Sequence, residues 1–545
     1  MNFLRFLWHE SGAMGRQISF ATFCSGAISG FLVTIILGAA STATDNTKSF
    51  SNLLMFAVAL TGMMTAKRFS LRRATVLTEG IVEKLRLRLA DKIRRAELFY
   101  FEKIGAERFH TLLTTETQVI SNTATMAINA SASAVMLVVA FGYIAFLSIP
   151  AFVLSLTAIS VTIIAYRLSL RSVDPLLRQT VEQENRFFAL LGHLLKGFPE
   201  IKMNVRKNHD LFGQHLQPAA ATLRDLKVDT GHRFVNTTII THSAFYVLLA
   251  VVIFLLPRLS QVEPSVIVKI SAVVLFIFGP LAEVVGVLPF LAKASVAIDA
   301  IEKMEQSLDR EVGSHPPVDL ENPPRSWDFE SVGVRDLRFQ YENADGSPGY
   351  ALGPINLTFK RGETVFIKGG NGSGKSTFLK LFTGLYPPRA GCITVNEKAV
   401  LGPQLQRYRE LFSIIFTDFH LFDRLYGLHA IDDEALAQLI DDMELTDKTA
   451  FQEGRFTNIE LSTGQRKRLA LITVLLENKP ILIFDEWAAD QDPTFRRHFY
   501  HEILPALKKE GKTIIAATHD DHYFDTADRV LGMDFGRFVA DESNN

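Results

Sequence analysis

Long apolar segments alternate with basic, helix-patterned segments through the first part of the chain. Six apolar segments are at or near membrane-spanning length, and the first five contain no Asp, Glu, Lys or Arg. They are Ile18–Ala40, Phe50–Ala66, Ala124–Ile149, Ala151–Tyr166, Phe234–Pro257 and Ser265–Ala292. Buried core helices of a soluble protein are the alternative, but six such runs so close together favour a membrane. We expect residues 1–312 to form a bundle of six transmembrane helices.

Basic residues gather in two of the connections between these segments. Twelve lie between the second and third segments, from Lys67 to Arg108, and eleven lie between the fourth and fifth, from Arg167 to Arg233. The other three connections are short and hold two basic residues between them. Because cytoplasmic loops of membrane proteins are enriched in Lys and Arg, we expect both long connections and both chain ends to be cytoplasmic.

Two polar residues within the apolar segments need an explanation. Glu283 lies in the sixth segment, and His242 lies in the fifth, beside several threonines. A carboxylate at membrane depth is costly unless it faces water or a partner. Glu283 and His242 are therefore candidates for lining a substrate cavity. The alternative is that the polar groups bond back to their own helix or to a neighbouring helix and serve packing alone.

The composition changes after residue 312. Residues 1–312 hold 31 basic and 23 acidic residues, whereas residues 313–545 hold 26 basic and 35 acidic residues. Residues 313–329 contain four prolines and little apolar periodicity, as is typical of a linker. The two cysteines, Cys24 and Cys392, lie in different parts, which argues against a disulfide framework. We expect a membrane domain at 1–312, a linker at 313–329 and a separate domain at 330–545.

A glycine-rich loop near the start of this second domain indicates phosphate binding. The segment ETVFIKGGNGSGKSTFLKLFTGL predicts a strand, a loop and an amphipathic helix, and it contains the full phosphate-loop pattern GxxxxGK[ST]. Its amides and helix N-terminus would bind phosphates, Lys375 would reach the β- and γ-phosphate oxygens, and Ser376 would coordinate Mg²⁺. We expect an α/β domain that binds ATP and Mg²⁺. The nucleotide contacts expected here are Gly369, Asn371, Gly372, Ser373, Gly374, Lys375, Ser376 and Thr377.

Two acids follow the apolar strand PILIFDE. Asp485 would hold Mg²⁺, and Glu486 is placed to orient and deprotonate the attacking water. His519 ends another apolar strand, in TIIAATHD, and would contact the γ-phosphate. A simple surface turn is the alternative for the two acids, but the phosphate loop favours the catalytic interpretation for Glu486, His519 and Lys375.

The stretch LSTGQ predicts a second anion site in the same domain. Ser462, Thr463, Gly464 and Gln465 begin a basic helix, so their amides and the Ser462 hydroxyl can bind phosphate. One nucleotide does not easily need both anion sites. We therefore expect two copies of the domain to face each other head to tail, most simply in a C2-symmetric homodimer with ATP between them.

These residues, in this order, resemble the ATP-binding cassette (ABC) transporter family over nearly the whole chain. The resemblance implies a type IV exporter-like fold, with the six-helix half fused ahead of the ATPase. It implies that Tyr341 stacks on adenine, the alternative being an ordinary strand tyrosine, and that Asp492 lies in a loop that communicates between the two ATP sites. Segments near Thr114–Thr117 and Asn204–Asp210 resemble the coupling helices of such exporters.

Three departures narrow the resemblance. Thr463 replaces the first of two glycines that are usual in the signature, and Thr417 stands where a Mg²⁺-contacting glutamine is usual. Asp418 beside it, or a water, would compensate. DEWAADQDP replaces the usual small residues after the glutamate. With LSTGQRKRLAL and THDDHYF, these features look like the cyclic-peptide exporter subfamily, which includes transporters of siderophore precursors such as pyoverdine's, of lipopeptides such as syringomycin, and of a microcin.

The resemblance implies an ATP hydrolase that exports a peptide-like or siderophore-like compound across the bacterial inner membrane by alternating access. Its partners would be a second copy of the chain and the lipid bilayer, with no nucleic acid, and its ATPase domain would be cytoplasmic. A flippase for lipids or lipid-linked compounds is the first alternative. A nucleotide-gated regulator or channel is the second, although Glu486, Lys375 and His519 favour turnover.

Overall fold

The computed structural model describes residues 3–41, 46–171, 174–260, 262–312, 327–343, 347–428 and 431–543. The chain forms two compact units. The first combines residues 1–87 with 112–301, and the second combines 88–111 with 302–545. The division at 312 and 329 expected from the sequence remains a proposal, and most of its linker, residues 313–326, lies outside the described residues.

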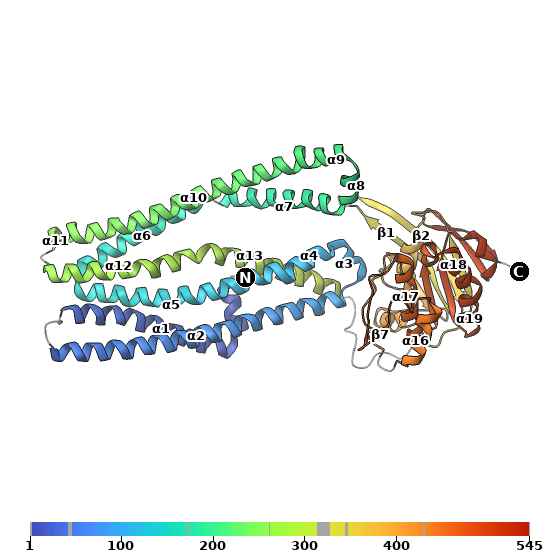
Figure 1. The fold of residues 1–545 in the computed structure, drawn as a ribbon, viewed down its shortest axis with the longest axis horizontal. Helices are drawn as coiled ribbons and strands as arrows, with labels where there is room; N and C mark the ends of the chain where they lie inside the picture. The colour runs from blue at the N-terminus through green and yellow to red at the C-terminus, as the bar shows by residue number, and fades with distance from the viewer. Residues whose placement is uncertain are drawn as a thin grey trace. The chain divides into compact units, whose positions relative to one another are not determined.

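Long helices make up the first unit and run side by side along its length (Figure 1). Its helices are α1 (Phe3–Ser41), α2 (Asn46–Arg95), α5 (Thr117–Leu147), α6 (Ile149–Arg171), α7 (Asp174–Lys196), α8 (Phe198–Met203), α9 (Val205–His209), α10 (Gln217–Ala250), α11 (Leu256–Leu259), α12 (Pro264–Gly286) and α13 (Leu288–Val312). The ends of α2 and α13 belong to the second unit. At about 1.5 Å per residue, the 50 residues of α2 extend well beyond the roughly 30 Å of a hydrocarbon core.

Four helical stretches among the described residues are long and apolar enough to cross a membrane. They are Arg5–Ala39, Phe50–Arg95, Ala106–Leu147 and Pro264–Arg310, and they overlap the first, second, third and sixth segments expected from the sequence. The fourth and fifth segments correspond to shorter apolar helices, Ile149–Ile164 and Ser243–Leu259. The helical membrane domain is therefore confirmed, and the count of six spans remains a prediction.

Close packing of α1 against α5 holds one side of this unit together. A Cβ atom added to Gly26 would lie 2.4 Å from the carbonyl oxygen of Ala132, and one added to Gly30 would lie 2.7 Å from Val139. Glycines four residues apart thus let the two backbones approach, as small residues do in membrane helix pairs. Buried apolar residues of α5, α6, α10 and α12, together with Val33 of α1, form a shared core.

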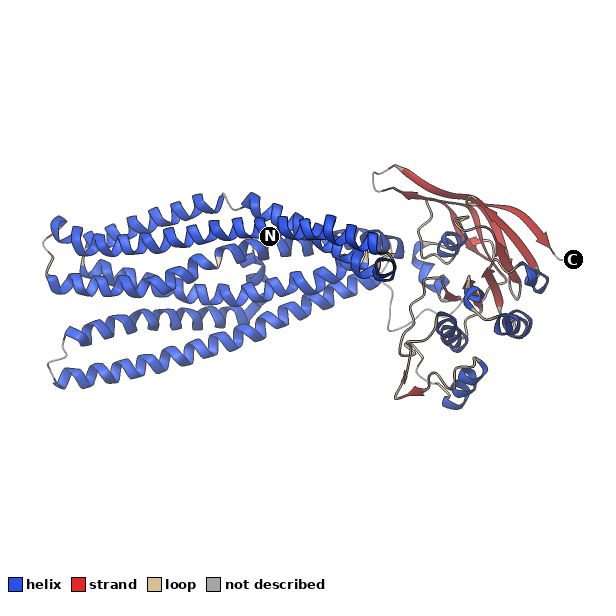
Figure 2. Cartoon of the chain, turned by 45° about the horizontal axis from the view of Figure 1, so that its top comes forward, coloured by secondary structure: helices blue, strands red, loops and turns tan. Residues whose placement is uncertain are grey.

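Two large sheets and a short two-stranded β7-β8 sheet lie in the second unit, and Figure 2 shows most of its strands gathered along one side with helices packed beside them. A four-stranded antiparallel sheet has the order β2-β1-β4-β5, and a six-stranded, mainly parallel sheet has the order β12-β11-β3-β10-β9-β6. The strands are β1 (Ser331–Glu342), β2 (Pro348–Lys360), β3 (Thr364–Lys368), β4 (Ala390–Val395), β5 (Lys398–Ala399), β6 (Phe412–Ile415), β7 (Phe451–Gln452), β8 (Arg455–Phe456), β9 (Ile481–Asp485), β10 (Thr513–Ala517), β11 (Arg529–Asp534) and β12 (Arg537–Ser543).

The central strands β9 and β10 of the parallel sheet are buried along their length, and eight α-helices accompany the sheets in the described part of this unit. They are α3 (Leu98–Ile104), α4 (Ala106–Thr111), α14 (Lys375–Phe382), α15 (Leu405–Arg409), α16 (Asp433–Asp442), α17 (Thr463–Glu477), α18 (Pro493–His498) and α19 (Leu504–Lys509). The carboxyl ends of parallel strands converge at one edge of such a sheet, which is where ligands bind. The α/β domain expected from the sequence is confirmed.

The connection between α2 and α5 turns earlier than the sequence suggested. Residues 112–116 form a π-helical segment that continues directly into α5, so Thr114–Thr117 is not a separate helix. The separate short helix is α3, which ends at Gly105 with a φ of 84° that glycine adopts without steric cost. The position expected for the second coupling helix agrees better with the structure, because the short helix α9 (Val205–His209) lies within Asn204–Asp210.

Candidate nucleotide-binding site

The loop between β3 and α14 has the backbone that a phosphate loop needs. Gly369, Gly372 and Gly374 have φ angles of 159°, 78° and 107°, of which the last two lie in the left-handed region. A Cβ atom on Gly374 would lie 2.4 Å from the hydroxyl of Tyr350, so a larger residue there would have to displace that ring. Glycine is required by both conformation and space, and the loop leads its amides to the N-terminus of α14.

Lys375, the first residue of α14, is buried beneath this loop. Its Nζ atom donates to the carbonyl of Gly369 at 2.8 Å and lies 3.0 Å from Nε2 of His519 and 3.3 Å from Oε1 of Glu486. The three residues predicted to be catalytic from separate parts of the sequence therefore form one cluster. His519 Nε2 also lies 3.1 Å from Glu486 Oε1, which closes the triangle.

Asp485 ends β9 beneath the same loop, and its side chain has the properties of a metal ligand. The residue is only 1% exposed, and among the described residues its Oδ1 atom has no hydrogen-bond partner. Burial raises the pKa of this carboxyl, while hydrogen bonds from Ser376 and Thr417 oppose that rise. A buried carboxylate beside two hydroxyls fits a Mg²⁺ ion, because hard cations prefer oxygen ligands and an unsatisfied buried acceptor is costly.

The two residues proposed to replace the usual glutamine differ in their surroundings. Thr417 donates its hydroxyl to the backbone oxygen of Asp485 at 3.2 Å, which places it beside the candidate metal ligand. Both residues are exposed in the loop that follows β6, so the contact to Asp485 is what distinguishes Thr417 from Asp418. Thr417 is thus the better placed of the two, and a direct metal contact by either remains a prediction.

The other predicted nucleotide contacts also line this part of the unit. Ser373 is buried, and its Oγ atom is another buried polar atom without a partner in the described part of the chain, whereas Asn371 is exposed. The Tyr341 hydroxyl lies 3.3 Å from the hydroxyl of Thr377, on the first turn of α14. Tyr341 is half-buried, so its ring is near the phosphate loop, where adenine stacking remains a prediction.

The second predicted anion site is the N-terminus of α17. Ser462 caps this helix, because its Oγ accepts from the amide of Gln465 at 3.5 Å while Gln465 Oε1 accepts from the amide of Ser462 at 3.2 Å. This capping box uses the Gln465 amide internally. The amides of Thr463 and Gly464 and the hydroxyl proton of Ser462 are left to bind an anion. The site therefore offers fewer hydrogen-bond donors than the sequence suggested.

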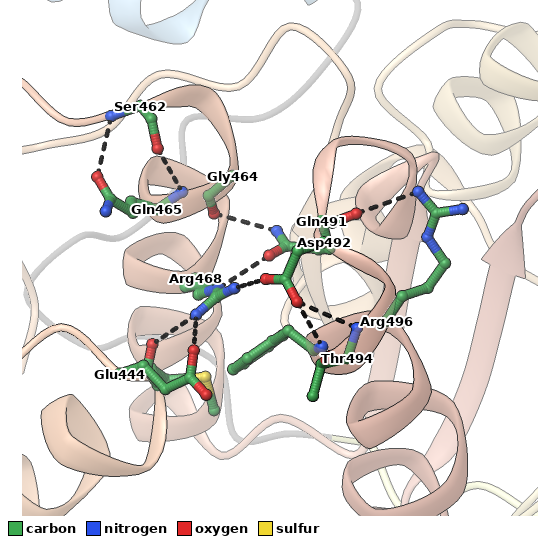
Figure 3. Close-up of polar contacts among 11 residues, drawn as sticks. Glu444, Ser462, Gly464, Gln465, Arg468, Gln491, Asp492, Thr494 and Arg496 are labelled. Atoms are coloured by element: carbon green, nitrogen blue, oxygen red, sulfur yellow. Dashed lines mark hydrogen bonds and ion pairs between the residues drawn. The ribbon is translucent and has the colours of Figure 1, made fainter.

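Arg468 connects this helix to the loop that contains Asp492 (Figure 3). The guanidinium is buried, pairs with Asp492 and with Glu444 (2.5 Å), and donates to Gln491 Oε1 at 2.9 Å. Gln491 in turn donates to the carbonyl of Gly464 at 3.0 Å. Hydrogen bonding from the Phe495 amide, together with Arg468, lowers the pKa of Asp492. Asp492 is therefore held as an anion at the start of α18.

Sequence reasoning missed the residues that hold these parts together. Lys467, Arg468 and Gln491 join α17 to the loop after β9, but the one available signal was a basic run in the sequence QRKRLAL. Helix α3 was also missed. Its Phe99 ring lies 5.4 Å from that of Phe339 and 6.1 Å from that of Tyr341, next to the predicted adenine contact.

The two candidates for a substrate cavity lie in the first unit. Glu283 accepts a hydrogen bond from the Ser133 hydroxyl across the α5–α12 contact. The side chain of His242 lies outside the described residues. A role for either residue in substrate binding remains a prediction.

Comparison with known proteins places this geometry in a family. Residues 352–489 match the family described as ABC transporter, and residues 18–203 match the ABC transporter transmembrane region. The chain is 32% identical to the ATP-binding protein SyrD of Pseudomonas syringae pv. syringae, over 85% of this chain and 83% of that protein. It is also 32% identical to an ATP-dependent lipid A-core flippase of Vibrio parahaemolyticus, over 38% of this chain and 37% of the flippase.

A solved structure has the same fold. The bacterial Atm1-family ABC exporter with ATP bound superposes with a TM-score of 0.77, at 17% identity, over 97% of this chain and 95% of the exporter. The agreement thus extends through both units, beyond the ATPase motifs alone. The chain belongs to the ABC transporter family, has the exporter fold, and carries its transmembrane region and its ATP-hydrolysing domain in one polypeptide.

Proposed function

We propose that the protein is a homodimeric exporter that uses ATP to move a cyclic peptide, a lipopeptide or a siderophore precursor across the bacterial inner membrane. The observation that carries the proposal is the combination LSTGQRKRLAL, DEWAADQDP and THDDHYF, which resembles the cyclic-peptide exporter subfamily. The similarity to SyrD supports it, because that match extends through the membrane region as well as the ATPase.

In this proposal each ATP lies between two protomers. The phosphate loop and Lys375 of one chain hold the nucleotide, and the N-terminus of α17 in the other chain, with Ser462, contacts its γ-phosphate. Mg²⁺, held by Asp485 and Ser376, would neutralise phosphate charge when bound. Lys375 leaves Glu486 for the phosphates, which frees the Glu486 carboxylate to accept a proton from the attacking water. His519 orients the γ-phosphate.

The short helices α3 and α9 would carry closure of the ATPase domains to the membrane helices. Within its own unit, α3 is tied to the ATPase by ion pairs from Glu102 to Lys380 at 2.9 Å and from Glu97 to Arg409 at 2.8 Å. Because Lys380 lies on α14, which follows the nucleotide-binding loop, and Phe99 of α3 lies 6.1 Å from Tyr341, a movement of that loop would move α3. The cavity that opens would contain Glu283 and His242.

The test is uptake into inside-out vesicles that contain the protein. A panel of cyclic peptides, lipopeptides and siderophore precursors is supplied with ATP, and accumulation is compared with that in vesicles carrying Glu486→Gln. We expect ATP-dependent accumulation of at least one compound and none in the variant. Accumulation of no compound, alongside normal ATP hydrolysis, contradicts the cargo class.

A lipid flippase is the second candidate, and the similarity to proteins named lipid A-core flippase favours it. Labelled lipids in the same vesicles distinguish the two functions, since a flippase moves the lipid between leaflets and leaves the peptide panel untouched. A nucleotide-gated channel would instead show ion flux that persists in Glu486→Gln protein with ATP bound.

A further inference from the structure

A buried lysine joins the signature helix to the backbone of the catalytic glutamate. Lys467, one turn into α17, is 2% exposed. Its Nζ atom donates to the backbone oxygen of Glu486 at 2.7 Å and lies 2.6 Å from Oδ2 of Asp490. A buried ammonium is stable only when paired and hydrogen-bonded, so these two contacts determine where it lies.

The glutamate that it contacts has an unusual backbone. Glu486 has a φ of 52° and a ψ of 36°, in the left-handed region that residues with a Cβ atom adopt rarely. This conformation turns the chain directly after β9 and sets the direction of the Glu486 side chain toward His519 and Lys375. A donor on the Glu486 carbonyl therefore acts on the orientation of the carboxylate, since carbonyl and carboxylate belong to one residue held in a strained turn.

Two further contacts make the connection rigid. The indole Nε1 of Trp487 donates to the backbone oxygen of Lys467 at 2.9 Å, and its ring packs 4.2 Å from that of Phe499. A Cβ atom on Gly464 would lie 2.6 Å from the backbone oxygen of Asp490, so the first turn of α17 and the turn after β9 are in close contact.

We propose that Lys467 is a positioning residue for ATP hydrolysis: it holds the backbone of Glu486 so that the carboxylate faces the nucleotide, and Asp490 holds Lys467. The inference rests on the proposed role of Glu486 as general base. In this proposal Lys467 also connects the two ATP sites of the dimer through one polypeptide. The N-terminus of α17 binds the ATP of the partner protomer in the proposed dimer, and Lys467 conveys the position of that helix to the Glu486 of its own protomer.

The alternative is that Lys467 only stabilises the fold. Measurements of kcat and of the KM for ATP distinguish a positioning role from a purely structural role. A positioning residue changes the chemical step, so its loss lowers kcat with little change in the KM for ATP. A structural residue lowers the amount of folded protein and changes neither constant per folded molecule.

The experiment measures ATP hydrolysis by the purified full-length protein in lipid nanodiscs, with fluorescent-nucleotide binding to count folded sites. The variants are Lys467→Met, which removes the ammonium, Lys467→Gln, which keeps a donor, and Lys467→Met with Asp490→Asn, which leaves no unpaired acid. Lys509→Met on the exposed surface of α19 is the matched control. Glu486→Gln tests the proposed general base independently.

For Lys467→Met we expect kcat per folded site to fall about 10- to 100-fold, since small misplacement of a catalytic group costs up to about 10². The KM for ATP should stay within about twofold. Lys467→Gln should recover part of the rate, the double variant should stay slow, and Lys509→Met should match the wild type. If Lys467→Met does not fold, the kcat values of Lys467→Gln and of the double variant are compared with the wild-type value instead.

Wild-type kcat per folded site in the double variant overturns the inference, as does an equal loss in Lys509→Met. Activity that survives in Glu486→Gln refutes the proposed general base instead. Loss in Glu486→Gln with no loss in the Lys467 variants leaves the proposed function intact and removes this inference alone.

Discussion

The ammonium of Lys375 lies 3.3 Å from Oε1 of Glu486, so the residue that should bind phosphate is paired with the residue that should activate water. The two roles are incompatible with this pair, because a phosphate-bound lysine and a base facing water must separate. In the proposed mechanism, nucleotide binding would rearrange both side chains at once, and Glu486 would stay paired with Lys375 until ATP binds.

Changing Glu486→Gln should abolish hydrolysis while keeping nucleotide binding. We expect kcat to fall by about 10² or more, the usual loss when a general base is removed. The affinity for ATP should not weaken, because an amide competes less than a carboxylate for Lys375. Phosphate release and fluorescent-nucleotide titration on the purified protein measure the two effects. A variant that hydrolyses ATP at near the wild-type rate would show that another group is the base.

Dimers with two different mutant chains should reveal whether ATP lies between protomers. Chains carrying Lys375→Ala and Ser462→Arg are given different affinity tags, and mixed dimers are isolated with both tags. In the proposed arrangement one site receives both changes and the other receives none, so up to about half of wild-type activity remains.

The matched control places both changes on one chain and pairs it with a wild-type chain. Each site between protomers then contains one change, so this dimer should be inactive. If both residues of a site came from the same chain, the outcomes would reverse, with the control retaining half the activity and the first dimer none.

Changing Asp485→Asn should stabilise the nucleotide-free protein at neutral pH and abolish Mg²⁺-dependent hydrolysis. Burial raises the pKa of Asp485, so the folded protein holds this proton to a higher pH than the unfolded chain does. Stability from this group is therefore present at low pH and is lost as the pH rises through the folded pKa. The amide carries no charge to desolvate.

We expect the apparent melting temperature without nucleotide at pH 7.5 to rise in Asp485→Asn, and the gain on adding ATP and Mg²⁺ to disappear. A lower melting temperature in the variant, or Mg²⁺-dependent turnover that persists, would contradict the assignment of Asp485 as a buried metal ligand.

Changing Arg468→Ala should destabilise the ATPase domain more than Arg497→Ala does. Arg468 is buried, stacks 3.6 Å over the ring of Phe495 and bonds to acids on both sides, whereas Arg497 is exposed. The partners of Arg468, Glu444 and Asp492, are half exposed or more, so we expect the free energy of unfolding to fall by only about 2 kcal/mol in Arg468→Ala. That corresponds to a decrease of about 4–8 °C in the apparent melting temperature. Equal melting of the two variants would show that the Arg468 network contributes nothing.

The sequence alone was sufficient to predict a helical membrane domain and an α/β ATPase domain, because the signals for both are local, whereas the count of six spans remains a prediction. A membrane helix is recognised from apolar composition over its own length, and a phosphate loop is recognised from glycines and a lysine at fixed spacing. Both depend on residues close together in the chain. The roles proposed for Lys375, Asp485, Glu486 and His519 came from the same kind of pattern, and the structure brings Lys375, Glu486 and His519 into one cluster.

The contacts that connect these motifs depended on tertiary structure. Nothing near Lys467 in the sequence indicates that its ammonium reaches the carbonyl of a residue 19 positions away, or that α3 packs its Phe99 beside Tyr341. The reason is physical. A pattern of side chains determines what a segment can do, whereas the partner of a buried charge or ring depends on which distant segment folding brings within a few ångströms of it.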